Sequence, residues 1–229
     1  WKEVKSYFFS PIAYVLIAMF ILISSIFFMS NLLYGIGEFN SNLSTMGYIL
    51  IFIIPILTMR ILAEDRKNGS EVLLITSPLR LSEIVLGKYF AALFVFFVMV
   101  LVSFVYPIIL VAFGASVTPQ LVGGYVGFIL LGASFIAVGL FASSITENQI
   151  IAAVISFVAL LIMWIADGIG SMVGGIFAKI LYWFSLLSRY KVFNKGILSL
   201  SAIIYYISFI AVFIFITAMN IERRRWSQG

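Results

Sequence analysis

The chain consists of long apolar stretches separated by short clusters of charged residues. Five intervals contain no charged side chain: residues 6–37, 39–59, 89–146, 148–166 and 196–221. A membrane-spanning helix needs about 20 mostly apolar residues, so four of these intervals hold one span each and 89–146 holds two. The small and polar residues of 114–119 divide that longest interval, because such clusters mark turns.

We therefore predict an all-α polytopic membrane protein, with one transmembrane domain over residues 1–229. Its six transmembrane helices are predicted at residues 12–33, 44–62, 87–113, 121–144, 149–167 and 200–221. Gly and Pro inside these segments do not argue against them, because membrane helices tolerate both residues. The first apolar run is too long for a cleavable signal peptide and lacks a cleavage site after it, so we expect this helix to be retained.

Basic residues predict the orientation of the spans, since cytoplasmic connections are enriched in Lys and Arg. With six spans, one side carries ten basic residues: Lys2, Lys5, Arg60, Arg66, Lys67, Arg80, Lys88, Arg223, Arg224 and Arg225. The other side carries four: Lys179, Arg189, Lys191 and Lys195. Both termini are therefore predicted to be cytoplasmic. A seventh span over 176–187 is the alternative, but that stretch is short and interrupted by Lys179.

Composition restricts the chemistry open to the chain. It is 63% hydrophobic and 10% charged, against about 25% charge in soluble domains, which excludes a water-soluble monomer. Cys and His are both absent, which removes thiol nucleophiles, thiolate ligands and the usual general base. No P-loop pattern occurs, so ATP is not expected to bind this chain through that motif. We expect no catalytic residue, metal or cofactor in this chain, and no nucleic-acid partner.

Two isolated carboxylates, Asp167 and Glu147, and several pairs of small residues are interpreted as structural features and not as functional sites. An ionisable residue within a membrane is a functional candidate by default, but Asp167 lies at a predicted helix end beside Gly168, which favours a side chain that is solvated or satisfied by hydrogen bonds. Glu147 is interpreted as part of a packed turn. Scarce buried charge argues against an ion-driven carrier.

Small residues at helical spacing favour close helix packing over a pore, as in Gly123 and Gly127, Ala133 and Ala137, and Gly139 and Ser143.

Residues 60–88 form the most informative connection, because nine of the 23 charged residues lie there. The run 64–67 is predicted to end a helix at Asn68-Gly69, since Gly commonly follows a helix C-terminus.

A short helix is predicted over residues 71–76 of this connection. Ser70 can cap its start and Pro78 prevents its continuation, while Ser82 can begin the next span. The apolar run 72–75 in a charged connection suggests a partner that buries it. Ordinary packing of the loop is the alternative.

Two further segments border the predicted spans. Residues 1–11 combine two Lys with four aromatic residues, which suits either an N-terminal interfacial helix or a simple anchor. Residues 168–199 form a long external connection, and its glycines at 168, 170, 174 and 175 are expected to loosen its start. The amphipathic run 176–184 and the basic, aromatic run 189–195 fit a re-entrant or interfacial helical hairpin. This hairpin is interpreted either as a gate or as an anchor in the membrane interface. The candidate gate residues are Tyr182, Trp183, Tyr190 and Phe193.

Four blocks of sequence resemble the type-2 ABC exporter permeases, near the branch associated with bacterial gliding motility. These blocks are residues 8–15, residues 55–60 with 63–78, residues 83–88 and residues 222–226. The family usually shows Gly-Thr where this chain has Gly69-Ser70. Members of the branch often carry His and Asp in the fifth loop, where this chain has Arg189 and Ser201.

The resemblance implies a permease subunit with cytoplasmic termini in the plasma membrane. It would pair with a second permease subunit, a copy or a paralogue, and with two separate ATP-binding cassette subunits that bind ATP and Mg. A cytoplasmic coupling helix would dock on the ATPase, and ATP-driven closure would rock the permease halves between inward- and outward-facing states. Carried over to this chain, the docking residues are Glu64, Asp65, Arg66, Gly69, Glu71, Leu74 and Pro78.

Three functions are compatible with these features. The first is an exporter permease that forms half of a translocation pathway. The second is a non-transporting membrane scaffold of an ATPase-driven envelope or motility machine. The third is a channel or carrier independent of ATP, which no ring of pore-lining charges supports.

Overall fold

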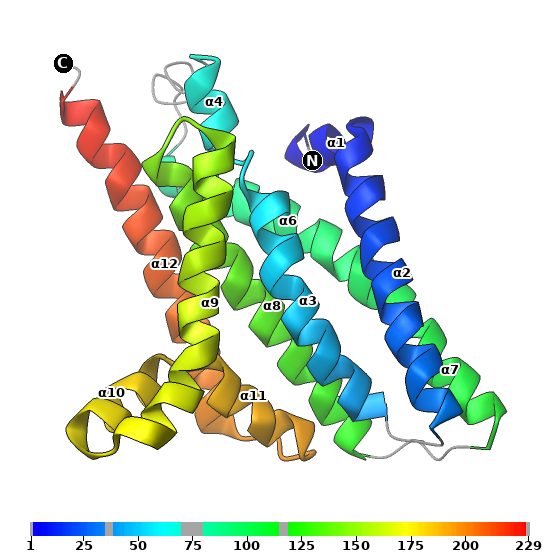
Figure 1. The fold of residues 1–229 in the computed structure, drawn as a ribbon. Coiled ribbons are helices and arrows are strands. Elements are labelled where there is room, and N and C mark those ends of the chain that lie inside the picture. The colour runs from blue at the N-terminus through cyan, green and yellow to red at the C-terminus, as the bar shows by residue number, and fades with distance from the viewer. Residues whose placement is uncertain (1, 35–38, 70–79, 115–118, 228–229) are drawn as a thin grey trace.

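The computed structural model describes residues 2–34, 39–69, 80–114 and 119–227 as a bundle of helices, with no strand among them (Figure 1). Within these described ranges, six helical stretches are long and apolar enough to cross a membrane: Pro11–Leu33, Phe39–Lys67, Leu81–Ala112, Pro119–Ile145, Gln149–Gly170 and Leu200–Arg224. The predicted all-α polytopic fold is therefore confirmed, with one such stretch at each predicted span.

The helices follow the chain in this order: α1 (Lys2–Phe9), α2 (Pro11–Leu33), α3 (Phe39–Thr58), α4 (Ala63–Lys67), α6 (Leu81–Ser103), α7 (Val105–Ala112), α8 (Pro119–Ile145), α9 (Gln149–Val173), α10 (Gly175–Phe184), α11 (Leu186–Asn194) and α12 (Leu200–Ser227). Both chain termini and α4 lie at one end of the bundle, which we call the terminal end (Figure 1). The segment that contains α10 and α11, which we call the hairpin, lies at the opposite, hairpin end, where α10 folds back against α9 (Figure 1).

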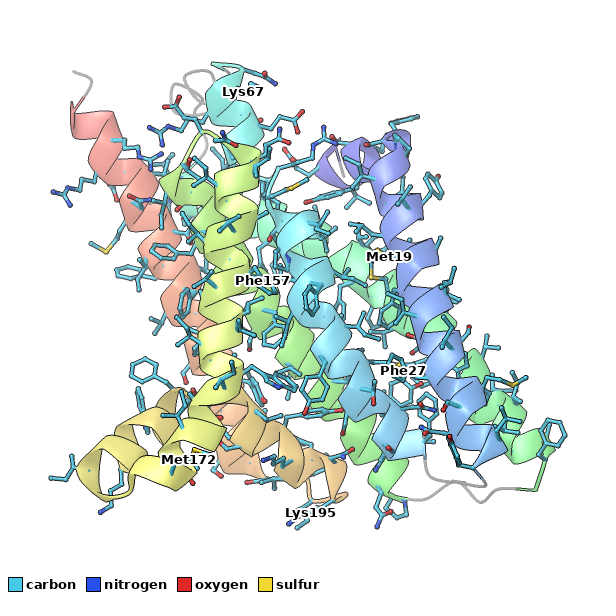
Figure 2. The ribbon with its side chains drawn as sticks, viewed as in Figure 1. Met19, Phe27, Lys67, Phe157, Met172 and Lys195 are labelled. Carbon is cyan, nitrogen blue, oxygen red and sulfur yellow. The ribbon has the colours of Figure 1, made fainter. Side chains whose placement is uncertain are left out.

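Charged and apolar side chains are distributed along the bundle as a membrane requires. Met19, Phe27 and Phe157 lie along its middle, whereas Lys67 and Lys195 lie at opposite ends (Figure 2). Met19 and Phe27 are exposed on α2. Exposure of such apolar side chains carries no free-energy penalty when lipid, and not water, surrounds the helix.

Helix α8 is the central element, and α3, α6, α9, α11 and α12 all pack against it. Its glycines allow the close approach. A Cβ atom on Gly127 would lie 2.6 Å from the Cβ of Phe193 in α11, and one on Gly139 would lie 2.1 Å from Oγ1 of Thr58 in α3. The interpretation of these small residues as packing positions is confirmed, since any larger side chain would displace the neighbouring helix.

The predicted span 87–113 is interrupted, so its description as one helix was wrong. Helix α6 ends at Ser103 and α7 begins at Val105. Pro107 has no N–H for the carbonyl of Ser103 and its ring clashes with that turn, which breaks the helix. The hydroxyl of Tyr125 in α8 donates to the freed Ser103 carbonyl at 3.1 Å, so the lost bond is replaced from a neighbouring helix.

The expectation that Gly168 and Gly170 loosen the chain was also wrong. Helix α9 continues through both residues to Val173, so the backbone of Asp167 lies inside the helix and not at its end. Neither glycine needs a special backbone angle, and membrane helices tolerate Gly. The helix ends at Gly174 and Gly175, whose φ angles are +66° and +68°, a region that favours glycine. The segment 168–199, in which a helical hairpin is predicted, therefore contains the end of α9 followed by α10 and α11; α10 folds back against α9, and α11 packs against α8.

The N-terminal segment forms the short helix α1, which packs against α2 and α6. Ser10 separates α1 from α2 and accepts a hydrogen bond from the backbone N–H of Ile12 at 3.5 Å. Pro11 occupies the first position of α2, where its missing N–H costs no helical hydrogen bond. Residues 2–9 are therefore helical, as predicted, and their location in a membrane interface stays a prediction.

Candidate functional site

The charged connection after α3 begins with a turn that is held by α8. The backbone N–H groups of Leu62 and Ala63 both donate to Oγ of Ser143 at 3.1 Å. The same hydroxyl donates to the carbonyl of Met59 at 3.1 Å. One serine thus satisfies three polar groups of a turn that has no helical partners for them. This contact fixes the start of α4 against α8.

An ion pair joins α4 to the turn between α8 and α9. Nη2 of Arg66 lies 2.8 Å from Oε1 of Glu147, and Nη1 of Arg66 donates to the carbonyl of Ile145 at 3.2 Å. A guanidinium at the C-terminus of α8 also complements the helix dipole. Glu147 is therefore more than the packed turn residue predicted from sequence, because it contributes an electrostatic link to α4.

A second ion pair closes the turn itself. Nε and Nη2 of Arg60 bind the two carboxylate oxygens of Glu64 at 2.7 and 2.8 Å. This two-pronged geometry is stronger and more directional than a single contact. Nη1 of Arg60 also donates to Oγ of Ser10 at 3.3 Å, so the turn is connected to the junction of α1 and α2.

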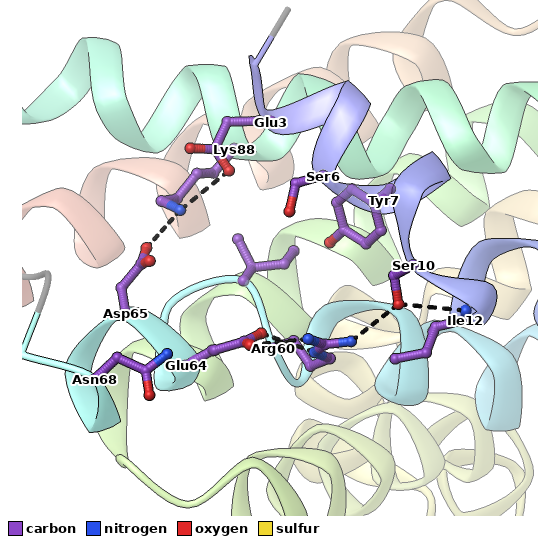
Figure 3. Close-up of a pocket in the computed structure, with 11 residues that line it drawn as sticks. Glu3, Ser6, Tyr7, Ser10, Ile12, Arg60, Glu64, Asp65, Asn68 and Lys88 are labelled. Carbon is purple, nitrogen blue, oxygen red and sulfur yellow. Dashed lines mark hydrogen bonds and ion pairs between the residues drawn. The ribbon is translucent and has the colours of Figure 1, made fainter.

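The third link centres on Lys88 of α6, whose side chain is only 4% exposed. Its Nζ lies 2.6 Å from Oδ2 of Asp65 in α4 and 3.3 Å from Oε2 of Glu3 in α1. Figure 3 shows the ammonium group between the two carboxylates. A buried charge is tolerated only when it is paired, so this lysine requires α1, α4 and α6 to stay together.

Tyr7 provides a further bond from α1 to α3. Its hydroxyl donates to the carbonyl of Leu57 at 3.1 Å, one of the last carbonyls of α3, which lack helical partners. Burial raises the pKa of the Tyr7 hydroxyl above its ordinary value, and the nearby carboxylate of Glu3 raises it further. The hydroxyl therefore stays protonated and remains a donor at any physiological pH.

These groups surround a small polar cavity of about 220 Å³ (Figure 3). Its lining residues are Glu3, Ser6, Tyr7, Ser10, Ile12, Arg60, Ile61, Glu64, Asp65, Asn68 and Lys88. The two cations and three carboxylates among them largely neutralise one another. Within the described residues no group of three His, Cys, Asp or Glu side chains could hold a metal ion. The lining groups link α1, α4, α6 and the turn after α3 to one another in a charged junction.

The chain leaves the charged connection at the start of α6. This helix begins at Leu81, and Oε2 of Glu83 accepts a hydrogen bond from the backbone N–H of Arg80 at 3.2 Å. The prediction that Ser82 begins this helix was therefore wrong. Glu83 satisfies the free N–H that precedes the helix, and its negative charge suits the N-terminus.

The predicted docking residues fall into two groups. Glu64, Asp65 and Arg66 lie on α4 and bind partners in the same chain, as described above. Asn68 and Gly69 end α4 as predicted, with φ of Gly69 at +71°. Glu71, Leu74, Pro78 and the predicted helix 71–76 lie outside the described residues. Lys67, Asn68 and Gly69 are exposed, so α4 presents a free surface where it joins this segment.

The predicted gate residues also separate into two groups. Tyr190 and Phe193 of α11 are fully buried, whereas Tyr182 and Trp183 of α10 are 38% and 64% exposed. The hydroxyl of Tyr205 in α12 donates to the carbonyl of Trp183 at 2.7 Å.

Arg189 completes the attachment of the hairpin. Its guanidinium stacks 3.6 Å from the centre of the Tyr205 ring and donates to the Tyr182 carbonyl at 3.1 Å. The hairpin is thus fixed to α8 through α11 and to α12 through Tyr205.

The sequence pattern did not reveal which residues hold the connection, namely Tyr7, Lys88 and Ser143. Each carried a weak signal. Lys88 is the last charge before the charge-free interval 89–146, Tyr7 is one of the aromatic residues before the first span, and Ser143 forms a small-residue pair with Gly139. None of these signals names a partner far away in the sequence.

The fold and the site define a class: a multi-pass α-helical membrane protein whose charged connection is held against α1, α6, α8 and the turn between α8 and α9. The sequence profile of the ABC-2 type transporter family matches residues 1–202. The chain therefore belongs to that family and is a transmembrane component of an ABC transporter, a class that normally works with an ATP-binding cassette ATPase. No curated protein sequence matches the chain.

Proposed function

We propose that this chain is the permease subunit of an ABC exporter, lies in the plasma membrane with both termini in the cytoplasm, and forms half of the translocation pathway. A second permease subunit, a copy or a paralogue, supplies the other half. A separate ATPase subunit binds ATP and Mg, and the connection 60–88 couples its hydrolysis to transport. This chain itself contributes no catalytic residue.

The observation that carries this proposal is the attachment of α4 to the rest of the bundle. Helix α4 is bound to α8 through Ser143, to the α8–α9 turn through Glu147, and to α1 and α6 through Lys88. A displacement of α4 would therefore act on several helices at once. Rigid-body motion of packed elements is an established way to convert a local event into a global change.

The position of α4 supports docking of the ATPase at the terminal end. Lys67, Asn68 and Gly69 are exposed there, directly before the apolar run 72–75. A partner that buries this run would meet the exposed end of α4. The carboxylates and guanidiniums behind it would hold the helix firmly while the partner moves.

At the hairpin end, the proposed gate consists of two parts with different tasks. Tyr190 and Phe193 are buried, so they would hold the hairpin on its own subunit. Tyr182 and Trp183 are exposed, so they would be the aromatic residues available to a substrate or a second subunit.

The docking assignment is tested with Glu71→Arg and with deletion of residues 71–76. In vesicles that contain the complete transporter, both variants are expected to abolish the coupling of ATP hydrolysis to transport while insertion of the permease is unchanged. The matched control is Lys195→Glu, a charge reversal at an exposed residue of the hairpin end, which should behave as the unmodified protein.

Two outcomes distinguish the remaining functions. Unchanged transport together with unchanged copurification of the ATPase in both variants would contradict the docking role of this segment. An ATPase that copurifies but whose rate never responds to any substrate would favour the non-transporting scaffold.

A further inference from the structure

A second concave surface lies between α8 and α12 at the terminal end, outside the charged junction. It is an open groove of about 630 Å³, within the range of pockets that enclose a small ligand. Its apolar wall consists of Phe141, Ile145, Ile216 and Met219, and its polar rim consists of Asn220, Glu222 and Arg223.

The groove is built into the packing of the two helices. Nδ2 of Asn220 donates to the carbonyl and to Oγ of Ser144 at 3.2 and 3.0 Å, and Arg224 donates to the same carbonyl. The ring of Phe141 packs edge-on against that of Phe213, with their centres 5.8 Å apart. These contacts hold α12 against the last turns of α8 and leave the groove open beside them.

The groove crosses the boundary between hydrocarbon and headgroups. Glu222 and Arg223 are the first charged residues after the charge-free interval 196–221, so they mark the level at which α12 leaves the hydrocarbon. Ile216 and Met219 lie one to two turns deeper on the same helix. An occupant that matches both parts must be amphipathic, with an apolar chain below and a polar group at the rim.

We propose that this groove binds phosphatidylethanolamine, with an acyl chain along Ile216 and Met219, its phosphate at Arg223 and its ammonium group at Glu222. The described residues that line the rim include one exposed positive and one exposed negative side chain, Arg223 and Glu222, which match the two charges of a zwitterionic headgroup. An anionic headgroup would face repulsion from Glu222. A choline headgroup has no N–H to donate to that carboxylate. This site is independent of the function proposed above.

The test is competitive retention of lipids by the full chain. The purified protein is equilibrated with equal amounts of phosphatidylethanolamine, phosphatidylcholine and phosphatidylglycerol that share the same acyl chains, and bound lipid is counted by native mass spectrometry. We expect phosphatidylethanolamine to be retained roughly tenfold over either competitor, the effect of one charge-assisted hydrogen bond. Equal retention of the three lipids would overturn the proposal and show adventitious binding only.

Three variants assign the contacts. Glu222→Lys should change the preference from phosphatidylethanolamine to phosphatidylglycerol, because the rim then carries two positive charges. Met219→Trp should lower retention of all three lipids by filling the groove. Ile207→Trp, at an exposed position of the same helix away from the groove, is the matched control and should retain lipid normally. A Glu222→Lys variant that still prefers phosphatidylethanolamine would overturn the proposal.

A second copy of the chain is the competing occupant, and it is tested separately. The sequence contains no Cys, so Met219→Cys provides a single thiol in the groove. We expect no disulfide between copies in oxidised membranes. Efficient formation of a disulfide-linked dimer through this position would show that protein covers the groove and would overturn the lipid site.

Discussion

Lys88 carries a positive charge in a position that is almost closed to solvent. Two carboxylates, Asp65 and Glu3, face it from different helices at 2.6 and 3.3 Å. Both carboxylates are partly exposed, with 26% and 40% of their side chains accessible. Solvent therefore weakens each contact, and the larger cost would come from leaving the lysine without partners. At the scale of single residues, this contact joins α1, α4 and α6 at the terminal end.

Replacement of Lys88 by Met should destabilise the chain by about 2 kcal/mol, because two carboxylates lose their counter-charge while the apolar stem is kept. Unfolding of the purified protein in denaturing detergent measures this change. Lys88→Arg should recover part of the stability, and Lys195→Met, at an exposed site, should change it by less than about 0.5 kcal/mol. Equal stability of Lys88→Met and the unmodified protein would show that the ion pairs contribute nothing net.

At the scale of elements, α8 determines how the other helices are arranged. Its glycines receive Thr58 of α3, Phe96 of α6 and Phe193 of α11, so three helices approach its backbone at positions where no side chain fits. Hydrophobic attraction between helices is weak in lipid, and close van der Waals packing replaces it. The positions of α3, α6 and α11 therefore depend on the absence of side chains on one helix.

Gly139→Ala should destabilise the protein by about 1–3 kcal/mol, the usual cost of overpacking, because the new Cβ would lie 2.1 Å from Oγ1 of Thr58. The matched control is Gly87→Ala in α6, where nothing lies within 4 Å of the added Cβ. That variant should be neutral or slightly stabilised. Detergent unfolding of both variants gives the comparison.

A second substitution tests the cause of the Gly139→Ala effect. Thr58→Ala removes Oγ1 and Cγ2 but keeps Cβ, which lies 2.8 Å from the added Cβ, so the double variant should recover part of the stability relative to Gly139→Ala alone. If the loss of stability in the double variant equals the sum of the losses in the two single variants, the contact of α3 with α8 is not the cause of the Gly139→Ala defect.

At the scale of the whole molecule, two charged ends are separated by an apolar middle. The terminal end gathers both termini, α4 and the ion pairs, and the hairpin end gathers α10 and α11. Long helices connect these ends, with α8 in contact with the junction at one end and with α11 at the other. A motion imposed on α4 would thus reach the hairpin through α8, which is the path that our proposed function requires.

The link between Arg66 and Glu147 tests this path. The pair is partly exposed, at 27% and 60%, so its loss should cost at most about 1 kcal/mol of stability. Arg66→Glu is expected to lower transport per ATP hydrolysed in reconstituted vesicles without reducing the amount of inserted protein. The charge-swapped double variant Arg66→Glu/Glu147→Arg should restore part of the coupling, because it remakes the ion pair but not the bond from Arg66 to the Ile145 carbonyl. Glu147→Gln, which removes the ion pair and leaves that bond in place, should lower coupling as well; unchanged coupling in Glu147→Gln would exclude this ion pair as a route of coupling.

The interruption between α6 and α7 shows where prediction from sequence reaches its limit. Pro107 could be recognised in the sequence as a helix breaker, but membrane helices tolerate Pro when a neighbour satisfies the freed carbonyl. The donor for Ser103 is Tyr125, a residue of another helix. The local sequence therefore indicates where the helix is interrupted, whereas the residue that satisfies the freed carbonyl is known only from the packing of the helices.

The sequence by itself determined the six spans, the helical class and the end of α4 at Asn68-Gly69. These features depend on local costs, namely the transfer of charges and unpaired backbone groups into hydrocarbon and the backbone freedom of glycine. Only the tertiary structure decided which charges meet. Glu3, Asp65 and Lys88 lie on three different helices, and their attraction acts only after helix packing has brought those helices together. The same packing formed the groove between α8 and α12, because its walls come from helices that are distant in the chain.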